Sequence, residues 1–215
     1  MPVEIKICGL STPETVDAAV AAGAEMIGLV FFPASPRNVS IEQAAALAER
    51  VRGRAKIVTL VVDADDALLQ DIARKVRPDL IQAHGSESPE RVAAITRLTG
   101  RPVIKAIRVR DAGDIAAAAD FSTVASLILY DAKAPETLGA SLPGGNGHAF
   151  DWGLLDGAPR PAFMLAGGLT PENVAEAIRV TGAPVVDVSS GVETAPGVKD
   201  IGLIRKFIEA AKAAR

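Results

Sequence analysis

The sequence has a single cysteine among 215 residues, and its first residues, MPVEIKICGL, lack a basic segment followed by a long apolar run. One thiol cannot form an internal disulfide, so an oxidising compartment would not stabilise this chain. No secretory signal is visible. No run of about 18 apolar residues occurs that could span a membrane. We therefore expect a cytoplasmic protein that does not associate with membranes.

Histidine and positive charge are scarce as well. Two histidines are too few for a histidine-based metal triad, and a net charge of −3 offers no broad basic surface to nucleic acid. Neither a P-loop nor a GxGxxG segment followed by an acidic ribose ligand occurs. The sequence thus predicts a globular protein without a metal, a cofactor or a nucleic-acid partner.

A regular alternation of short β-branched runs and alanine-rich helical stretches fills the chain. Runs that predict strands lie at residues 3–9, 26–32, 56–63, 79–84, 102–109, 127–132, 161–168 and 185–191. Apolar strands separated by helices are typical of a parallel sheet covered by helices. Eight such units predict an α/β protein in which residues 1–215 form a single (β/α)8 TIM barrel. An open, doubly wound sheet is the alternative.

Several helical stretches carry start and stop signals. Thr12-Pro13, Ser88-Pro89 and Thr170-Pro171 each place a capping hydroxyl before a proline at the first helical position. Gly23 and Gly53 are predicted stops. The stretch 133–150 is rich in glycine and proline and predicts a long loop after the sixth strand, which we expect to close over a substrate.

Polar residues follow the predicted strands at their carboxyl ends, where barrels of this type have their active sites. Side chains alternate along a strand, so Lys6 and Cys8 share one face, as do Gln82 with His84 and Asp187 with Ser189. These strand-end residues are Lys6, Cys8, Arg37, Asp63, Gln82, His84, Asp131, Gly167, Gly168, Asp187, Ser189 and Ser190. Polar groups on a sealed strand face are costly, so their clustering indicates a site.

The last two strand ends predict phosphate binding. Barrels often hold phosphate between the loops after strands seven and eight, with backbone N–H groups and a helix N-terminus. Those loops here are LAGGLT, with Gly167 and Gly168, and DVSSGVE, with Ser189 and Ser190. A tight turn would explain the two glycines alone, but the serines in the neighbouring loop favour phosphate.

Other candidates keep two interpretations each. Cys8 is either a small core residue or a base whose thiolate is favoured by the charge of Lys6. Asp131, which ends an apolar strand, is either a helix cap or an acid. Arg37 is either a solvated loop residue or a fork for a carboxylate or phosphate. His84 is either a satisfied core imidazole or part of the site.

In order along the chain, KICGL, FFPASPR, QAHGSE, GGNGHAFDW, LAGGLTPENV and DVSSGVE with GVKD closely resemble the motifs of the phosphoribosylanthranilate isomerase family. The resemblance covers essentially the whole chain. The LAGGL-like and SSG-like pieces occur in other phosphate-binding barrels, whereas KICG, GGNG-FDW and SSGVE-GVKD together are specific. One departure is Ala83, where the family commonly has leucine. By strand parity Ala83 faces away from Gln82 and His84, so we expect a packing consequence only.

The resemblance implies roles for individual residues. Cys8 matches the family's general base and Asp131 its general acid. Arg37 matches the arginine that binds the anthranilate carboxylate, and Asp187 resembles the residue facing the ribose hydroxyls. His84 is a further substrate-binding candidate. The phosphate loops match Gly167, Gly168, Ser189, Ser190 and Gly191.

The implied activity is the Amadori rearrangement of N-(5-phosphoribosyl)anthranilate in tryptophan biosynthesis, by a monomer or homodimer without a cofactor. Rival functions are another phosphosugar isomerase, a non-catalytic phosphosugar-binding barrel, and a bifunctional isomerase that also accepts the aminoaldose of histidine biosynthesis. An indole-glycerol-phosphate synthase would need catalytic lysines, a glutamate and an extra N-terminal segment, and a ribulose-phosphate epimerase would need more histidines. A bifunctional barrel would carry an aspartate on the first strand, where this chain has Cys8.

Overall fold

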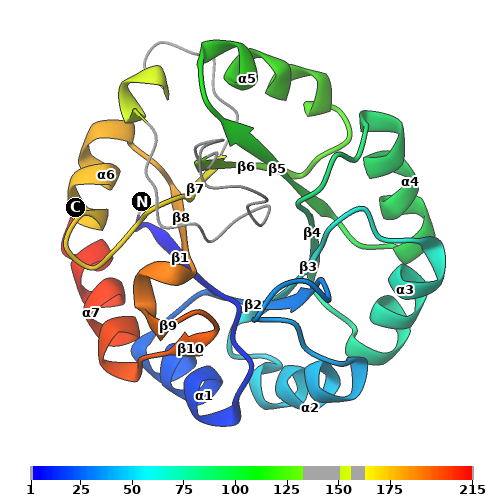
Figure 1. Ribbon diagram of the computed structural model, residues 1–215, viewed down its shortest axis with the longest axis horizontal. Coiled ribbons are helices and arrows are strands. Elements are labelled where there is room, and N and C mark those ends of the chain that lie inside the picture. The colour runs from blue at the N-terminus through cyan, green and yellow to red at the C-terminus, as the bar shows by residue number, and fades with distance from the viewer. Residues whose placement is uncertain (1, 133–150, 156–162, 215) are drawn as a thin grey trace.

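The computed structural model describes residues 2–132, 151–155 and 163–214, and within them eight parallel strands close into a barrel (Figure 1). The strands pair in chain order, and β1 pairs with both β2 and β8. The barrel strands are β1 Glu4–Cys8, β2 Met26–Phe31, β3 Lys56–Val61, β4 Leu80–Ala83, β5 Val103–Val109, β6 Leu127–Ala132, β7 Phe163–Leu165 and β8 Val185–Val188. The predicted barrel is thereby confirmed and the open sheet is excluded. The long loop predicted at 133–150, with His148 and most of the GGNGHAFDW motif, lies outside the described residues.

Helices form a ring around these strands (Figure 1). They are α1 Pro13–Ala22, α2 Ile41–Val51, α3 Asp66–Asp71, α4 Pro89–Thr99, α5 Ala112–Ala117, α6 Val174–Thr181 and α7 Ile201–Lys212. Single turns of 3-10 or π helix lie at Ile72–Val76, Ala118–Phe121, Trp152–Leu155 and Ser190–Val192. Within the described chain, no helix is both long enough and apolar enough to cross a membrane.

The helix start signals are confirmed twice and wrong once. The hydroxyls of Thr12 and Ser88 cap α1 and α4, as expected. The helix expected to start at Thr170-Pro171 is α6, and it begins only at Val174, because residues 171–173 form a turn. In that turn the side chain of Asn173 accepts a hydrogen bond from Thr170 N and donates one to Gly168 O. The predicted stop at Gly53 is also displaced, since α2 ends at Val51 and Arg52 caps it.

Two apolar layers hold the barrel together. Inside it pack Met26, Val58, Ile104, Ala106, Leu129, Met164, Ala166 and Val185. The opposite strand faces, including fully buried Ala83, pack against the helices in a larger core. A filled interior means that the barrel is no pore, so a ligand site is expected at its carboxyl end.

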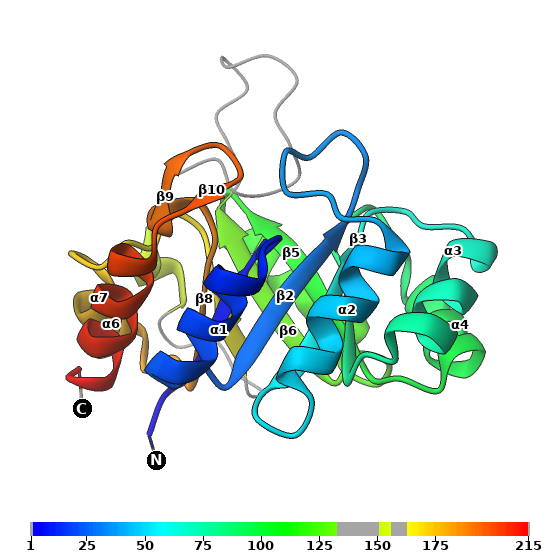
Figure 2. The same cartoon turned by 90° about the horizontal axis from the view of Figure 1, so that it is seen from below.

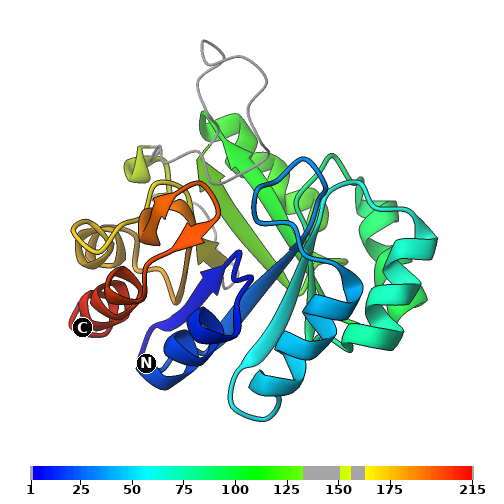
Figure 3. The same cartoon turned by 60° about the horizontal axis from the view of Figure 1, so that its bottom comes forward.

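A short hairpin that the sequence did not reveal follows β8. Strands β9 Glu193–Ala195 and β10 Val198–Lys199 pair antiparallel. The hairpin and the loop after β2 rise from the same end of the barrel, side by side (Figures 2 and 3). A Cβ built on Gly197, at the hairpin turn, would lie 2.6 Å from Pro36 O, so the two segments are in direct contact.

Candidate active site

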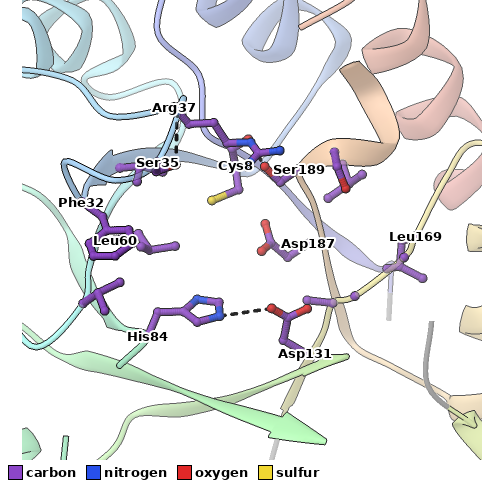
Figure 4. Close-up of a pocket in the computed structure, with 17 residues that line it drawn as sticks. Cys8, Phe32, Ser35, Arg37, Leu60, His84, Asp131, Leu169, Asp187 and Ser189 are labelled. Carbon is purple, nitrogen blue, oxygen red and sulfur yellow. Dashed lines mark hydrogen bonds and ion pairs between the residues drawn. The ribbon is translucent and has the colours of Figure 1, made fainter. Parts of the chain in front are cut away.

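A cavity opens at the carboxyl ends of the strands, with polar side chains from strands on opposite sides of the barrel around it (Figure 4). All of the residues to which the family resemblance gives a role line this cavity, except Gly191. They are Cys8, Arg37, His84, Asp131, Gly167, Gly168, Asp187, Ser189 and Ser190. Gly191 instead lets two loops touch, because a Cβ there would lie 1.9 Å from Leu169 O.

Cys8 ends β1 and is buried beside Lys6 and Asp187. Lys6 is fully buried and donates to Asp187 Oδ1 at 2.9 Å, so its charge is already balanced inside the barrel. Burial raises the pKa of the Cys8 thiol above its usual value, the nearby ammonium of Lys6 opposes this, and the Asp187 carboxylate adds to it. Lys6 thus favours the thiolate, as expected, but burial outweighs its effect and the pKa of the thiol is raised on balance.

Space for the thiol comes from the neighbouring strand. Gly28 of β2 is the register partner of Cys8, and a Cβ at that position would lie 2.8 Å from Cys8 Sγ. Any larger residue would therefore displace the sulfur. No local sequence signal marks Gly28 as a residue of the site.

Asp131 is the residue before the last one of β6, on the other side of the cavity, and His84 is its partner (Figure 4). His84 Nε2 lies 3.1 Å from Asp131 Oδ2, and His84 Nδ1 lies 2.8 Å from Gln82 Nε2. All three side chains are buried. Asp131 is thus part of a chain of hydrogen bonds inside the barrel, and it does not cap a helix, since both Asp131 and Ala132 belong to β6.

The loop after β7 approaches Asp131 closely. Gly167 has a φ of 84°, and a Cβ there would lie 2.2 Å from Ala132 N and 2.9 Å from Asp131 Oδ1. Only glycine fits this backbone conformation and this contact. Within the described residues the N–H groups of Gly167 and Gly168 find no acceptor. Two such N–H groups at a cavity wall are suited to an anion.

The loop after β8 is held by a lysine that the sequence analysis did not assign. Lys199 Nζ donates to Ser189 O at 2.9 Å, to Ser189 Oγ at 3.2 Å and to Glu193 Oε1 at 2.6 Å. Ser189 Oγ donates in turn to Cys8 O at 3.2 Å. Lys199 therefore links the predicted phosphate loop to the hairpin, and the end of β1 is tied to both.

Arg37 is buried against the same hairpin. Its Nε and Nη2 donate to the two carboxylate oxygens of Glu193, each at 2.7 Å. This bidentate pair uses one edge of the guanidinium. Arg37 is only 5% exposed, so the interpretation as a solvated loop residue is wrong. Glu193 and Lys199 lie in the SSGVE-GVKD motif, but no sequence pattern indicates that they contact Arg37.

Arg37 lines the cavity, and together with the buried side chains of Glu193 and Lys199 beside it carries one net positive charge. Arg37 and Lys199 each carry one positive charge, and Glu193 alone opposes them. Burial by itself would raise the pKa of Glu193, but the hydrogen bond from Arg37 and the charge of Lys199 hold it below its usual range, so the carboxylate stays ionised. Burial also lowers the pKa of Lys199 despite Glu193. One net positive charge beside the cavity favours an anionic ligand there.

The cavity has two chemically different walls. Val30, Phe32, Leu60 and Val62 form an apolar wall on the β2 and β3 side, next to Arg37. The glycine and serine loops form the opposite wall after β7 and β8, and Figure 4 shows Cys8, Asp187 and Asp131 between the two. The site is therefore shaped for a ligand with an apolar anionic end and a second anionic end.

Asp63, another strand-end residue, does not reach the cavity. Its Oδ1 accepts from Ser86 N at 2.8 Å, and its own N–H donates to Glu87 Oε1 at 2.9 Å. Glu87 also accepts from Lys105 Nζ at 2.7 Å, and both side chains of this pair are buried. This network braces the loop that follows His84. Among the described residues no three histidine, cysteine or acidic side chains are arranged to hold a metal ion.

Comparison with known proteins gives one consistent result. The family model described as N-(5'phosphoribosyl)anthranilate (PRA) isomerase matches residues 5–210. An N-(5'-phosphoribosyl)anthranilate isomerase of Rhodopseudomonas palustris (strain BisA53) is 58% identical over 214 residues, 99% of this chain and 97% of that protein.

Solved structures agree with this. The phosphoribosyl anthranilate isomerase of Thermotoga maritima superposes with a TM-score of 0.88 at 35% identity, covering 98% of this chain and 99% of that one. A phosphoribosyl anthranilate isomerase in complex with reduced 1-(o-carboxyphenylamino)-1-deoxyribulose 5-phosphate gives a TM-score of 0.84 at 33% identity, with coverage of 98% and 99%.

Proposed function

The chain belongs to the N-(5'-phosphoribosyl)anthranilate isomerase family, and we propose that Cys8 and Asp131 are the base and the acid of its isomerisation. The reaction is the Amadori rearrangement of N-(5-phosphoribosyl)anthranilate to 1-(2-carboxyphenylamino)-1-deoxyribulose 5-phosphate, a step of tryptophan biosynthesis. The observation that carries the assignment is the placement of Cys8 and Asp131 in one cavity between an apolar wall beside Arg37 and the two glycine and serine loops.

The two walls orient the substrate. The anthranilate ring lies on the apolar wall, with its carboxylate on the free edge of Arg37. The phosphate lies against the N–H groups of Gly167 and Gly168 and the hydroxyls of Ser189 and Ser190. A related protein binds a ligand with the same carboxyphenylamino and phosphate ends, which supports this orientation. Binding both ends fixes the sugar between acid and base, where orientation contributes to the rate.

Two proton transfers then complete the reaction. Asp131 gives a proton to the furanose ring oxygen, the C1–O bond breaks, and the nitrogen lone pair forms the C1=N bond of an imine cation. The Cys8 thiolate removes the proton from C2, the C–H electron pair forms C1=C2, and the C=N electrons return to nitrogen. The resulting enolamine tautomerises to the ketose. Asp187, fixed by Lys6, faces the sugar hydroxyls between the two catalytic groups.

The first test is fluorescence-monitored consumption of phosphoribosylanthranilate, generated in situ, by the protein and by its Cys8→Ala and Asp131→Asn variants. General acid or base catalysis contributes about 10²–10⁴-fold, so each variant should lose that much kcat. Ligand-induced thermal stabilisation without any turnover by the parent protein would instead favour a non-catalytic phosphosugar-binding barrel. Near-normal turnover in either variant would remove that residue from its role.

A bifunctional isomerase is tested by following the consumption of the aminoaldose of histidine biosynthesis by the same protein, for example by chromatography. That substrate has no anthranilate ring to occupy the apolar wall and no carboxylate for Arg37, so we expect no turnover. The cytoplasmic location and the choice between monomer and homodimer stay predictions.

A further inference from the structure

A buried chain of hydrogen bonds runs inside the barrel from Gln82 to His84 and on to Asp131. Gln82 is completely buried and does not line the cavity, so it cannot touch a ligand there. His84 lines the cavity, yet both of its ring nitrogens already have protein partners. The isomerisation described above uses neither side chain.

The direction of the first bond fixes the protonation of the imidazole. The amide nitrogen of Gln82 is a donor only, so His84 Nδ1, 2.8 Å away, must accept and carry no hydrogen. A neutral imidazole then has its hydrogen on Nε2, which donates to Asp131 Oδ2 at 3.1 Å.

The reversed amide would be worse satisfied. In the observed orientation Gln82 Oε1 is buried without a partner, which leaves one acceptor unused. Turning the amide over would place Oε1 on His84 and leave the NH2 group, with two donors, in the unpaired position. Because each buried unpaired polar group costs free energy, the observed orientation is the less costly one.

From this geometry we propose that Gln82 is a positioning residue that locks His84 as its Nε2–H tautomer, so that Oδ2 of Asp131 is permanently occupied and Oδ1 is the oxygen that donates the proton. The inference rests on the proposed role of Asp131 as the acid. Oδ1 lies on the side of Gly167, where the lack of a side chain leaves room beside it. When Oδ1–H gives its proton to the ring oxygen, the carboxylate formed is stabilised by the standing hydrogen bond from His84 at Oδ2.

Nitrogen-15 NMR tests the tautomer directly and without turnover. The chain has two histidines, so a His148→Gln background leaves only the signals of His84. We expect a non-protonated Nδ1 and a protonated Nε2. Gln82→Glu replaces the donor with a carboxylate that accepts, so the proton should appear on Nδ1. A protonated Nδ1 in the parent background would overturn the proposal and would leave the function assignment untouched.

Kinetics tests the consequence for the acid. Gln82→Met and Gln82→Glu should each lower kcat about 10-fold, less than the loss expected for the acid itself, with KM changed less than about 2-fold. In the Asp131→Asn background neither substitution should lower kcat further, because the group that Gln82 positions is gone. A rise in KM at unchanged kcat, or fully additive losses, would contradict a positioning role.

A matched control separates this role from packing. Thr59 lies on β3, faces away from the barrel interior, and has a buried hydroxyl without a partner. Thr59→Val keeps the volume nearly constant and should leave kcat, KM and the His84 signals unchanged. A parent protein with no turnover would refute the proposed function, whereas the NMR signals would still report the tautomer.

Discussion

At the scale of single residues, Cys8 is a thiol under opposing influences. Burial raises its pKa above the usual value, and the positive charges of Lys6 and Lys199 act in the other direction. The base of the reaction is the thiolate, so its fraction in the free enzyme grows with pH up to this raised pKa. Cys8 is the only cysteine of the chain, so the ultraviolet absorbance of its thiolate reports this directly, with Cys8→Ala as the blank. We expect that absorbance to grow from about pH 7 towards about pH 9 without a plateau near neutrality.

Two lysine substitutions test this effect of charge on the Cys8 thiol. Lys199→Met removes a charge that lowers the pKa of Cys8, so the alkaline limb of the thiolate titration should move to higher pH. Lys56→Met removes an exposed lysine that pairs with Glu4 at the other end of the barrel, and it should not move the limb. A pH profile that is already flat at neutrality would show that the free enzyme holds Cys8 as thiolate.

Single residues also show which features of the site could be predicted from the sequence and which could not. Strand parity was enough to place Cys8, Asp131 and Asp187 around one cavity, because a barrel strand presents alternate residues to its interior. Parity could not show that burial outweighs Lys6 at the thiol, since that depends on how Asp187 neutralises the lysine. The partner of Arg37 was equally hidden, because Glu193 is distant in sequence and meets it only through the folded hairpin.

At the scale of elements, the β9–β10 hairpin holds the side chain of Arg37 in place. It bears Glu193 and Lys199 and packs against the loop after β2 at Gly197. Strands this short carry no periodicity that a sequence could reveal. The same limit explains the wrong start of α6, where Thr170 and Pro171 form a capping pattern but the side chain of Asn173 stabilises a turn instead.

Separating the hairpin from this loop should weaken substrate binding more than catalysis. Gly197 has a φ of 83°, and a Cβ there would lie 2.6 Å from Pro36 O. Gly197→Ala should therefore displace Glu193, loosen Arg37 and raise KM about 10-fold, with a smaller change in kcat and a loss of about 1–2 kcal/mol in the free energy of unfolding. Steady-state kinetics measure KM and kcat, and urea unfolding measures the free energy of unfolding.

Gly100→Ala is the matched control for that substitution. Gly100 ends α4 with a φ of 67°, but a Cβ there would meet nothing within 4 Å. This variant should lose a similar amount of stability from backbone strain and keep its KM. An equal rise of KM in both variants would mean that lower stability, and not the contact with Pro36, affects binding.

At the scale of the whole molecule, the regular alternation of strands and helices was sufficient to predict the closed barrel. Each βα unit is local, and right-handed crossovers place successive strands side by side. Closure itself depends on the pairing of β1 with β8, which no local pattern encodes but which follows once eight strands are present. The buried ion pairs that link distant units were not predictable, because their partners come from different units.

Because of those buried ion pairs, the free energy of unfolding of the barrel should decrease at acidic pH. Burial alone would raise the pKa of Glu87, but the hydrogen bond from Lys105 and the charge of Lys105 hold it below its usual range, and Glu193 is lowered in the same direction. An acid whose folded-state pKa is lowered binds its proton less readily in the folded than in the unfolded protein. Its stabilising contribution is complete above the unfolded pKa, about 4.3 for glutamate, and is lost as pH falls through the lower folded pKa.

The free energy of unfolding should therefore fall steeply below about pH 4.5, as urea midpoints measured from about pH 7 to about pH 3 will show. Glu87→Gln leaves Lys105 without its buried partner and should cost about 3 kcal/mol at neutral pH. Because the variant has no carboxylate to protonate at this position, its stability should also fall less between about pH 5 and about pH 3. Replacing the exposed carboxylate of Glu176, which pairs with Arg179 on the surface, should change neither quantity by more than about 0.5 kcal/mol. An unchanged acid slope in Glu87→Gln would assign the acid sensitivity to carboxylates other than the buried one that braces the loop after His84.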